Sequence, residues 1–477
     1  MALRELTDIL GPENIDAEAL TCFPNNVDEI IRIVKTTRRL GVKVRAVSTG
    51  RNWGYHTFFP KDKDCWTLNL SRMNRIIDFD RELGVVTIEP GVTQQDLKTF
   101  IDNNNLPFIV PTTGAGPTCS IMGNILERGY GVTQYFDSFA SCMSLEAILP
   151  DGNYYRSPLL ALGGHRIGRI YKWGVGPYVD GIFSQSHHGI CISMNVALKR
   201  RTSGIMAVFF ETDRAPATLI NPIVNILHVM GGLLGPIKIT NHHRLLAILD
   251  QAPELRSETP LEKSLRAQEF FLANGIPHWQ GFFAAYTDDI LLRSVQQLVE
   301  NALKTSVRRL YCRIDNQEPA AARERLFLDL VTGTPNHRAL PLTYFRAPKL
   351  PGPDDPFSPE KDGAGILWYA PLIPATQECV ELYLDFATNI TTRFGFEPAI
   401  TFTSLSDRCF DSVLPILFNG HDANQAEKAR ACYRALFHEG QQQGIIPYRV
   451  PECFRDLIIK SNREVVFGQN LCHPPRA

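Results

Sequence analysis

A glycine-rich run, STGRNWGYH at residues 48–56, follows directly on a short strand-like stretch at 42–47. Its two glycines allow backbone conformations that other residues rarely adopt, and successive exposed N–H groups can then surround an anion such as a pyrophosphate. Arg51 and Asn52 would add a charge and further donors. No G-x-G-x-x-G sequence opens a helix here, so the run does not indicate a Rossmann fold or an NAD site. Taken alone, it predicts a turn that can hold an anion.

A second glycine-rich stretch, PTTGAGPTCSIMGN at residues 111–124, is long and mostly uncharged, and it leads into LERGYG at 126–131. Such a stretch is typical of backbone that runs close beside a large flat or phosphorylated ligand, although a purely structural loop would look the same. Two loops of this kind flanking strands in one domain favour a dinucleotide ligand that is bound without a Rossmann helix.

The first 200 residues alternate helix-like and strand-like patterns. Apolar residues recur at helical spacing over 26–41 and 93–104. Strand-like runs occupy 42–47, 66–70, 85–88, 139–150 and 189–199. This order predicts an α+β domain that ends near Arg200.

The rest of the chain predicts a second domain of the α/β type. Strand-like runs at 206–212 and 278–286 alternate with helical ones at 219–229 and 290–304. The stretch 347–365 carries five prolines in nineteen residues and is therefore expected to be a linker. After it, a strand at 365–372, a helix at 376–394 and a strand at 399–405 repeat the alternation.

Composition narrows the classes of partner. A length of 477 residues predicts two substantial domains. Lys plus Arg number 49 against 50 Asp plus Glu, which gives no reason to expect a nucleic acid or a membrane as partner. The charged N-terminus, the lack of 18 consecutive apolar residues and eleven cysteines without a CxxC pair predict a cytoplasmic protein with reduced thiols. The His pairs at 187–188 and 242–243 have no third ligand nearby, so no metal site is predicted.

Six motifs follow one another along the first 200 residues: STGRNWGYH (48–56), NLSRMNR (69–75), EPGVT (89–93), SIMGNILERG (120–129), LPDG (149–152) and GVGPYVDGIFSQS (174–186). Together they resemble the FAD-binding domain of the vanillyl-alcohol oxidase and p-cresol methylhydroxylase flavoproteins. The resemblance spans about residues 20–200, and LWYAP (367–371) and YRV (448–450) carry a weaker similarity near the end.

The resemblance implies an α+β fold in which a two-subdomain FAD-binding domain of the p-cresol methylhydroxylase type covers residues 1–203. An α/β cap domain with an antiparallel sheet would cover 204–440 and contribute to the substrate site. The segment 441–477 would return to the FAD-binding domain. It is expected to be shortened, because the chain ends in CHPPRA without the family's closing segment of the DPxxILxPGRSG kind.

The resemblance also implies FAD as the cofactor, with its pyrophosphate on the loop at 48–56 and its isoalloxazine ring at the junction with the cap. The implied cofactor contacts are Ser48, Gly50, Arg51, Asn52, Gly54, Pro111, Thr112, Ser120, Gly123, Asn124, Glu127, Gly189 and Ile190.

Members of this family oxidise 4-alkylphenols by transferring a hydride from the benzylic carbon to flavin N5. Tyr55, Tyr448 and Arg449 match the two tyrosines and the arginine that hold the phenolate oxygen. The resemblance therefore implies a small aromatic, phenolic substrate, with O2 or a partner cytochrome as electron acceptor. A homodimer is compatible with it.

Several positions depart from the family pattern. Ala115 stands where an aspartate lies close to N5, and Ile366 stands where a histidine links covalently to the flavin. Arg51 falls where related flavoproteins of the berberine bridge type place another linking histidine. We therefore expect noncovalent FAD, with His56, His187, His188 or a cysteine as the remaining candidates for a tether.

The substrate side departs as well. Ile400 aligns with an acidic residue of the family, and Cys409-Phe410 align with a His-His pair. These changes predict a site that has exchanged charge for apolar surface. Two alternatives to a phenol-oxidising enzyme therefore stay open: a flavin-binding subunit or scaffold with little turnover, and a specialised-metabolite oxidase with a non-phenolic substrate.

Overall fold

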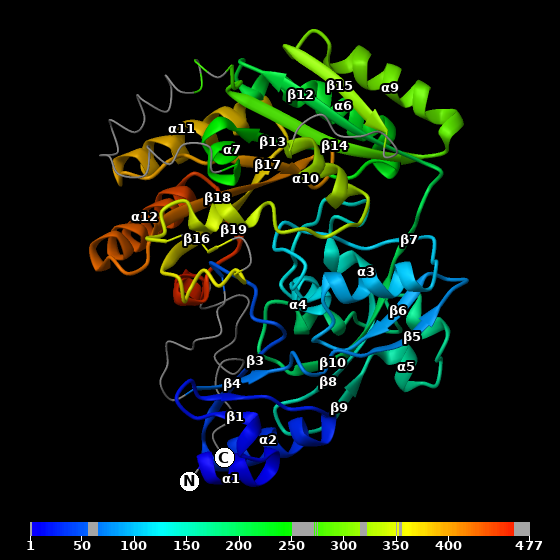
Figure 1. Cartoon of the computed structure of the whole chain (residues 1–477), viewed down its shortest axis with the longest axis vertical. Helices are drawn as coiled ribbons and strands as arrows, with labels where there is room; N and C mark the ends of the chain where they lie inside the picture. The colour runs from blue at the N-terminus through cyan, green and yellow to red at the C-terminus, as the bar shows by residue number, and fades with distance from the viewer. Residues whose placement is uncertain are drawn as a thin grey trace.

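The computed structural model describes residues 2–55, 65–249, 271, 273, 275–314, 322–349, 351–352 and 355–461. The chain forms two bodies, which lie one above the other in Figure 1. The N-terminal 200 residues build the lower body and residues 204–449 build most of the upper one.

The first subdomain packs two helices against a small sheet. Its strands are ordered β1-β2-β4-β3, with parallel pairing of β4 to both β2 and β3. Helix α2 begins after Asn26, whose side chain accepts from the Glu29 N–H, and ends at Gly41 in the left-handed conformation. The elements are α1 (Ala2–Leu10), β1 (Ile15–Asp16), β2 (Thr21–Cys22), α2 (Val27–Leu40), β3 (Lys43–Val47) and β4 (Cys65–Asn69).

The second subdomain is an antiparallel five-stranded sheet of order β5-β6-β10-β8-β9. Leu97 and Ile101 of α3 and Ile125 of α4 are buried against it. The elements are β5 (Ile76–Asp80), β6 (Val85–Ile88), α3 (Gln94–Asn103), α4 (Ile121–Leu126), β8 (Cys142–Ile148), β9 (Tyr154–Arg156), α5 (Pro158–Ala161) and β10 (Ile190–Ala197); β7 (Phe108–Ile109) and β11 (Lys199–Arg200) pair beside them.

The upper body is built on an antiparallel eight-stranded sheet of order β15-β12-β14-β13-β17-β18-β16-β19. Its strands are β12 (Gly204–Thr212), β13 (Lys238–Asn241), β14 (Trp279–Thr287), β15 (Arg309–Ile314), β16 (Ala364–Pro374), β17 (Thr401–Ser404), β18 (Cys409–Asn419) and β19 (Ile446–Arg449). Its helices are α6 (Ile220–Met230), α7 (His242–Leu249), α9 (Asp289–Leu303), α10 (Ala322–Val331), α11 (Gln377–Arg393) and α12 (Ala423–Gln442); α13 (Arg455–Ser461) follows the last strand.

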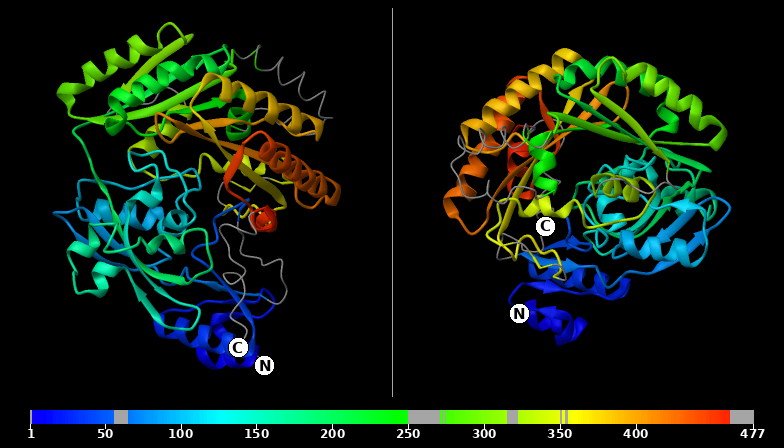
Figure 2. Two further views of the ribbon diagram at one scale, coloured as in Figure 1. Left: turned by 180° about the vertical axis from the view of Figure 1, so that it is seen from behind. Right: turned by 45° about the horizontal axis from the view of Figure 1, so that its top comes forward.

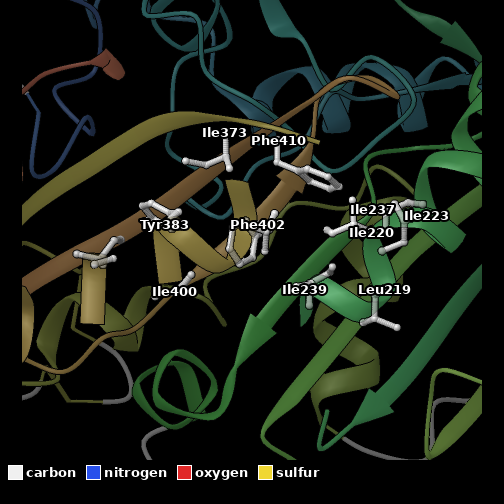
Figure 3. Packing of buried hydrophobic residues seen from close by; sticks show 14 of the residues in the cluster. Leu219, Ile220, Ile223, Ile237, Ile239, Ile373, Tyr383, Ile400, Phe402 and Phe410 are labelled. Atoms are coloured by element: carbon white, nitrogen blue, oxygen red, sulfur yellow. The ribbon is translucent and has the colours of Figure 1, made fainter. Parts of the chain in front are cut away.

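Helices α6, α9, α11 and α12 pack on the outer face of this sheet, away from the lower body (Figure 2). Alternate strand residues point into that layer, as Ile239, Phe402 and Phe410 do in Figure 3. The intervening residues, Lys238, Thr403 and Asp411, consequently face the FAD-binding domain. Both the antiparallel cap sheet and the two-subdomain α+β architecture confirm the fold expected from the resemblance.

The C-terminal part of the chain belongs to both bodies. Strand β19 pairs with β16 and so forms an edge of the cap sheet. Directly afterwards, the Glu452 N–H donates to the Tyr55 carbonyl at 2.8 Å, and the Glu452 carboxylate meets Arg45 at 2.8 Å. The expected return towards the FAD-binding domain thus starts after a strand that is part of the cap.

Helix α6 with its flanking turns, Pro216–Leu233, has the length and composition of a membrane-spanning helix. Within it, Ile220, Ile223 and Ile226 are buried in the cap core. A core helix passes the same test of length and composition, so this segment is a weak indication of a membrane.

Candidate active site

Arg449, at the end of β19, is held by residues of the FAD-binding domain. Its Nη2 donates to Asn52 Oδ1 at 2.7 Å and lies 3.5 Å from Glu127 Oε2. Its guanidinium carbon lies 3.9 Å from the centre of the Tyr55 ring, close enough for a cation–π contact. The cap strand therefore delivers a cation to the glycine-rich loop and to the end of α4.

Two tyrosines complete this cluster. Burial raises the pKa of the Tyr55 and Tyr448 hydroxyls, so both stay protonated and can donate hydrogen bonds. Burial disfavours the charge of Arg449, but Tyr55, Glu127 and Tyr448 outweigh it, and the pKa of Arg449 is raised. Tyr130 packs edge-on against Tyr448 with ring centres 5.3 Å apart. A permanent cation beside two hydroxyl donors suits a bound oxyanion.

The loop before Tyr55 has a conformation that requires glycine. Gly50 and Gly54 have φ of 64° and 82°. A Cβ on Gly54 would lie 2.5 Å from Cδ1 of Trp368, which donates its indole N–H to the Trp53 carbonyl at 2.7 Å. The Trp368 ring also stacks near the Tyr55 ring, with centres 6.5 Å apart. Close packing between loop and cap strand β16 thus sets the position of Tyr55.

The loop residues expected to bind the cofactor carry buried polar atoms that the protein leaves without a hydrogen bond. These atoms are Arg51 Nε and Asn52 Nδ2. A Cβ on Gly123 would lie 3.2 Å from Ser48 Oγ, so the loop passes close to α4 where a side chain would crowd it. Unpaired donors on a glycine-containing loop fit a ligand rich in acceptor oxygens, as FAD is.

Other expected cofactor residues make contacts within the protein. Thr112 donates its hydroxyl to the Leu330 carbonyl at 2.5 Å, and Ser120 caps α4 by accepting from the Gly123 N–H at 2.9 Å. Asn124 donates to Ser138 Oγ at 2.7 Å, and Ile190, next to Gly189, is buried in the core of the first subdomain. Pro111, Ser120 and Asn124 nevertheless line one small cavity. Their contact with FAD stays a prediction.

Three charged residues of the cap were missed by sequence reasoning: Asp411 on β18, Lys238 on β13 and Arg244 on α7. Asp411 is 1% exposed, its Oδ1 has no hydrogen-bond partner, and burial raises the pKa of its carboxyl to about 7 against the opposing effect of Lys238, Arg449 and Arg244. Burial lowers the pKa of Lys238 to about 8 and that of Arg244 to about 10. The expectation that this site has exchanged charge for apolar surface is therefore wrong.

The residues that replace the family's acid and histidines lie as follows. Ile400 is buried in the cap core, so it does not face the site. Cys409 is on β18 two residues before Asp411 and shares its face of the sheet. No short motif marks Asp411, and the sequence analysis predicts no strand at this position.

Ile366, at the expected tether position, packs with Trp53, Leu340 and Leu417. Ala115 lies on the second glycine-rich stretch, where its N–H donates to Thr113 Oγ1. His56 lies outside the described residues. His187 contacts Arg455, and the His242 ring lies tilted against that of His243 with ring centres 4.2 Å apart. Among the described residues no group of His, Cys, Asp and Glu side chains has the arrangement of a metal site.

Comparison with known proteins places this geometry in a family. Residues 19–157 match the FAD binding domain family. The 1'-carboxy-chondrochloren decarboxylase of Chondromyces crocatus is 29% identical over 450 residues, 90% of this chain and 82% of that protein. The flavoprotein subunit of the hydroxylating 4-cresol dehydrogenase of Pseudomonas putida is 25% identical over 498 residues, 96% of this chain and 89% of that subunit.

Among solved structures, p-cresol methylhydroxylase with substrate bound superposes with a TM-score of 0.87 at 21% identity, covering 96% of this chain and 90% of that one. The fold, the matched FAD-binding region and the relatives agree with the unpaired donors on the glycine-rich loop. The chain is thus a flavoprotein with FAD as its cofactor; it has an FAD-binding domain of the p-cresol methylhydroxylase type and is similar over most of its length to flavoproteins of the p-cresol methylhydroxylase and vanillyl-alcohol oxidase family.

Proposed function

We propose that this protein is an FAD-dependent oxidoreductase that removes a hydride from a small phenolic substrate. One observation carries the proposal: the Arg449 guanidinium lies 3.9 Å from the Tyr55 ring and is hydrogen-bonded to the Tyr448 side chain, so that one cation and two tyrosines meet. The Pseudomonas putida relative, which is named for 4-cresol, supports a phenol as the substrate.

Each residue has a definable role. Arg449 stabilises the phenolate by its charge, which lowers the pKa of a bound phenol. Tyr55 and Tyr448 donate to the same oxygen, because the raised pKa of each hydroxyl keeps its proton in place. Arg51 and Asn52 would hold the cofactor through their unpaired donors. Bound FAD supplies the hydride acceptor at its N5.

Asp411 is the group suited to exchange a proton with the substrate. Its carboxyl has a pKa raised to about 7 by burial, so both protonation states are accessible near neutral pH. The charges of Arg449 and Arg244 act on it, which places it within electrostatic reach of the phenolate site. An acid in this position weakens the case for an inactive scaffold, which rested partly on the loss of an acid at Ile400.

Anaerobic mixing of the holoenzyme with 4-ethylphenol tests the proposal. We expect the visible absorbance of the flavin to bleach as it is reduced. The methyl ether of the same phenol is the matched control, because it has no ionisable hydroxyl for Arg449 and is expected to leave the flavin oxidised. Oxidised flavin with a series of 4-alkylphenols and 4-hydroxyphenyl carboxylic acids, or equal bleaching by the ether, contradicts the proposal.

The electron acceptor is proposed to be O2 or a partner cytochrome. Mixing reduced protein with oxygenated buffer separates the two. Fast reoxidation makes the protein an oxidase. Slow reoxidation favours a dehydrogenase that passes electrons to a cytochrome.

Decarboxylation of a carboxylated phenol is the second candidate function. The Chondromyces crocatus relative is named a decarboxylase of a 1'-carboxy compound, and the partly buried Lys238 and Arg244 would suit a substrate carboxylate. Release of CO2 in step with flavin reduction would establish this reaction. Flavin reduction by the same compound without CO2 would exclude it.

A further inference from the structure

The cap sheet arranges polar residues in one row on its inner face. Lys238 of β13 is opposite Thr403 of β17, and Thr403 is opposite Asp411 of β18. Residues that pair across antiparallel strands point to the same face, and the neighbours Ile239, Phe402 and Phe410 point to the helix layer. Lys238 is therefore two strand spacings, roughly 10 Å, from Asp411 along this row.

Arg244 joins the row from the start of α7. Its guanidinium carbon lies 4.9 Å from the centre of the Trp368 ring, and Trp368 in turn stacks on Tyr55. Arg244 Nη1 is buried and makes no hydrogen bond. Burial lowers the pKa of Lys238, and the neighbouring cation of Arg244 lowers it further. Lys238 and Arg244 therefore both face the site, and Arg244 Nη1 is available to donate a hydrogen bond there.

The charges in this cluster do not balance. Lys238, Arg244 and Arg449 are opposed by Asp411 and Glu127, and Glu127 is engaged with Arg449. For Lys238 and Arg244, Asp411 is the carboxylate that acts on both within the part of the chain that the structure describes. Lys238 and Arg244 share the single carboxylate of Asp411. Burying two cations beside one carboxylate is unfavourable unless a further anion binds to them.

We propose that Lys238 and Arg244 form a subsite for a carboxylate carried by the substrate, on the substituent para to its phenolic hydroxyl. This inference rests on the proposed function, which assigns the phenolic end to Arg449. The substrate class is then a hydroxyphenyl carboxylic acid rather than a simple 4-alkylphenol.

Binding of 4-hydroxycinnamate and of its methyl ester to the holoenzyme tests the subsite. Neither compound has a saturated benzylic carbon from which a hydride can leave, so dissociation constants are measured without turnover, by calorimetry or by the change in flavin absorbance. We expect the acid to bind at least tenfold more tightly than the ester. Equal dissociation constants for the pair in the native protein would overturn the inference.

Variants locate the effect. We expect Lys238→Met and Arg244→Gln each to reduce the preference for the acid to below threefold while the ester's dissociation constant stays unchanged. Lys238→Arg should restore the preference. Lys304→Met, at an exposed position of the same domain, is the matched control and should keep it. A tenfold preference that survives in both Lys238→Met and Arg244→Gln, with FAD content and Tm near native, contradicts the subsite.

A third ligand separates this inference from the proposed function. 4-Methoxycinnamate keeps the carboxylate but lacks the phenolic hydroxyl. Weaker binding of this ligand than of 4-hydroxycinnamate, with the difference abolished in Arg449→Ala, supports the phenol site. Equal binding of the two, with the acid still preferred to its ester, would defeat the phenol site and leave the carboxylate subsite standing.

Discussion

Arg449 Nη2 and Asn52 Oδ1 are joined by a hydrogen bond of 2.7 Å, although the two residues are 397 positions apart in the chain. One belongs to the last strand of the cap sheet and the other to the glycine-rich loop of the FAD-binding domain. The same arginine lies over the ring of Tyr55, three residues beyond Asn52. The anion site and the cofactor loop are therefore one structural unit, and changes to either should affect both.

Replacement of Arg449 removes the cation of the anion site. We expect Arg449→Ala to lower kcat/KM for a phenolic substrate at least tenfold, which corresponds to about 1.4 kcal/mol of lost transition-state stabilisation. Steady-state kinetics measure kcat/KM for both proteins, with the phenol that bleaches the flavin as substrate. Arg408→Ala, at an exposed position of the cap, is the matched control. An unchanged kcat/KM in Arg449→Ala would refute the role assigned to this residue.

A side chain at Gly54 should disturb the loop. The position has φ of 82°, and a Cβ would lie 2.5 Å from the Trp368 ring. We expect Gly54→Ala to lower the free energy of unfolding by about 1 kcal/mol or more and to weaken FAD retention. Gly232→Ala, where the space is open, should behave as native. Thermal unfolding and the flavin-to-protein absorbance ratio are the measurements, and native values for both in Gly54→Ala would contradict the expectation.

The Asp411 carboxyl should make stability depend on pH. Burial raises its pKa to about 7, whereas an unfolded aspartate has a pKa of about 3.9. Between these values the folded protein binds more protons than the unfolded chain. The free energy of unfolding should therefore fall as pH rises from about 4 to about 7, by up to about 1.4 kcal/mol per pH unit.

Urea denaturation at several pH values measures that slope. In Asp411→Asn we expect the contribution to vanish, because the amide does not titrate. A slope that is the same in native protein and variant would show that Asp411 titrates alike in the folded and unfolded states.

The flavin should be released by acid. Ile366 has no nucleophilic atom and is buried among Trp53, Leu340 and Leu417, so it offers no covalent bond at the expected tether position. After acid precipitation we expect the yellow colour in the supernatant. Colour that stays in the pellet would indicate a covalent link to another residue, and peptide mass spectrometry would identify it.

Local elements were predictable because they depend on neighbours in sequence. Strand β6 occupies Val85–Ile88 as expected, and α2 lies within the predicted range 26–41. Capping by Asn26 and termination at Gly41 are both local signals. The family resemblance and the FAD cofactor were predictable for the same reason, because each FAD-binding motif is a short run of consecutive residues.

The charged half of the site was not predictable in this way. Lys238 and Asp411 share a face only through the register of β13, β17 and β18, which no short motif records. Ile400 aligns with the acid of the family, but its side chain turns into the cap core. The adjacent strand β18 supplies the carboxylate of Asp411 instead, and only the pairing of β17 with β18 reveals this position.

The position of strand β19 late in the chain determines when Arg449 is synthesised relative to the cofactor loop. It is the last strand of the cap sheet, and Glu452 then fastens the chain to Tyr55 and Arg45. During translation, the glycine-rich loop leaves the ribosome hundreds of residues before Arg449 does. A nascent chain that stops before residue 446 contains the cofactor loop but not the guanidinium for the phenolate. The residues expected to contact the flavin and the guanidinium expected to bind the phenolate therefore leave the ribosome at different moments of synthesis.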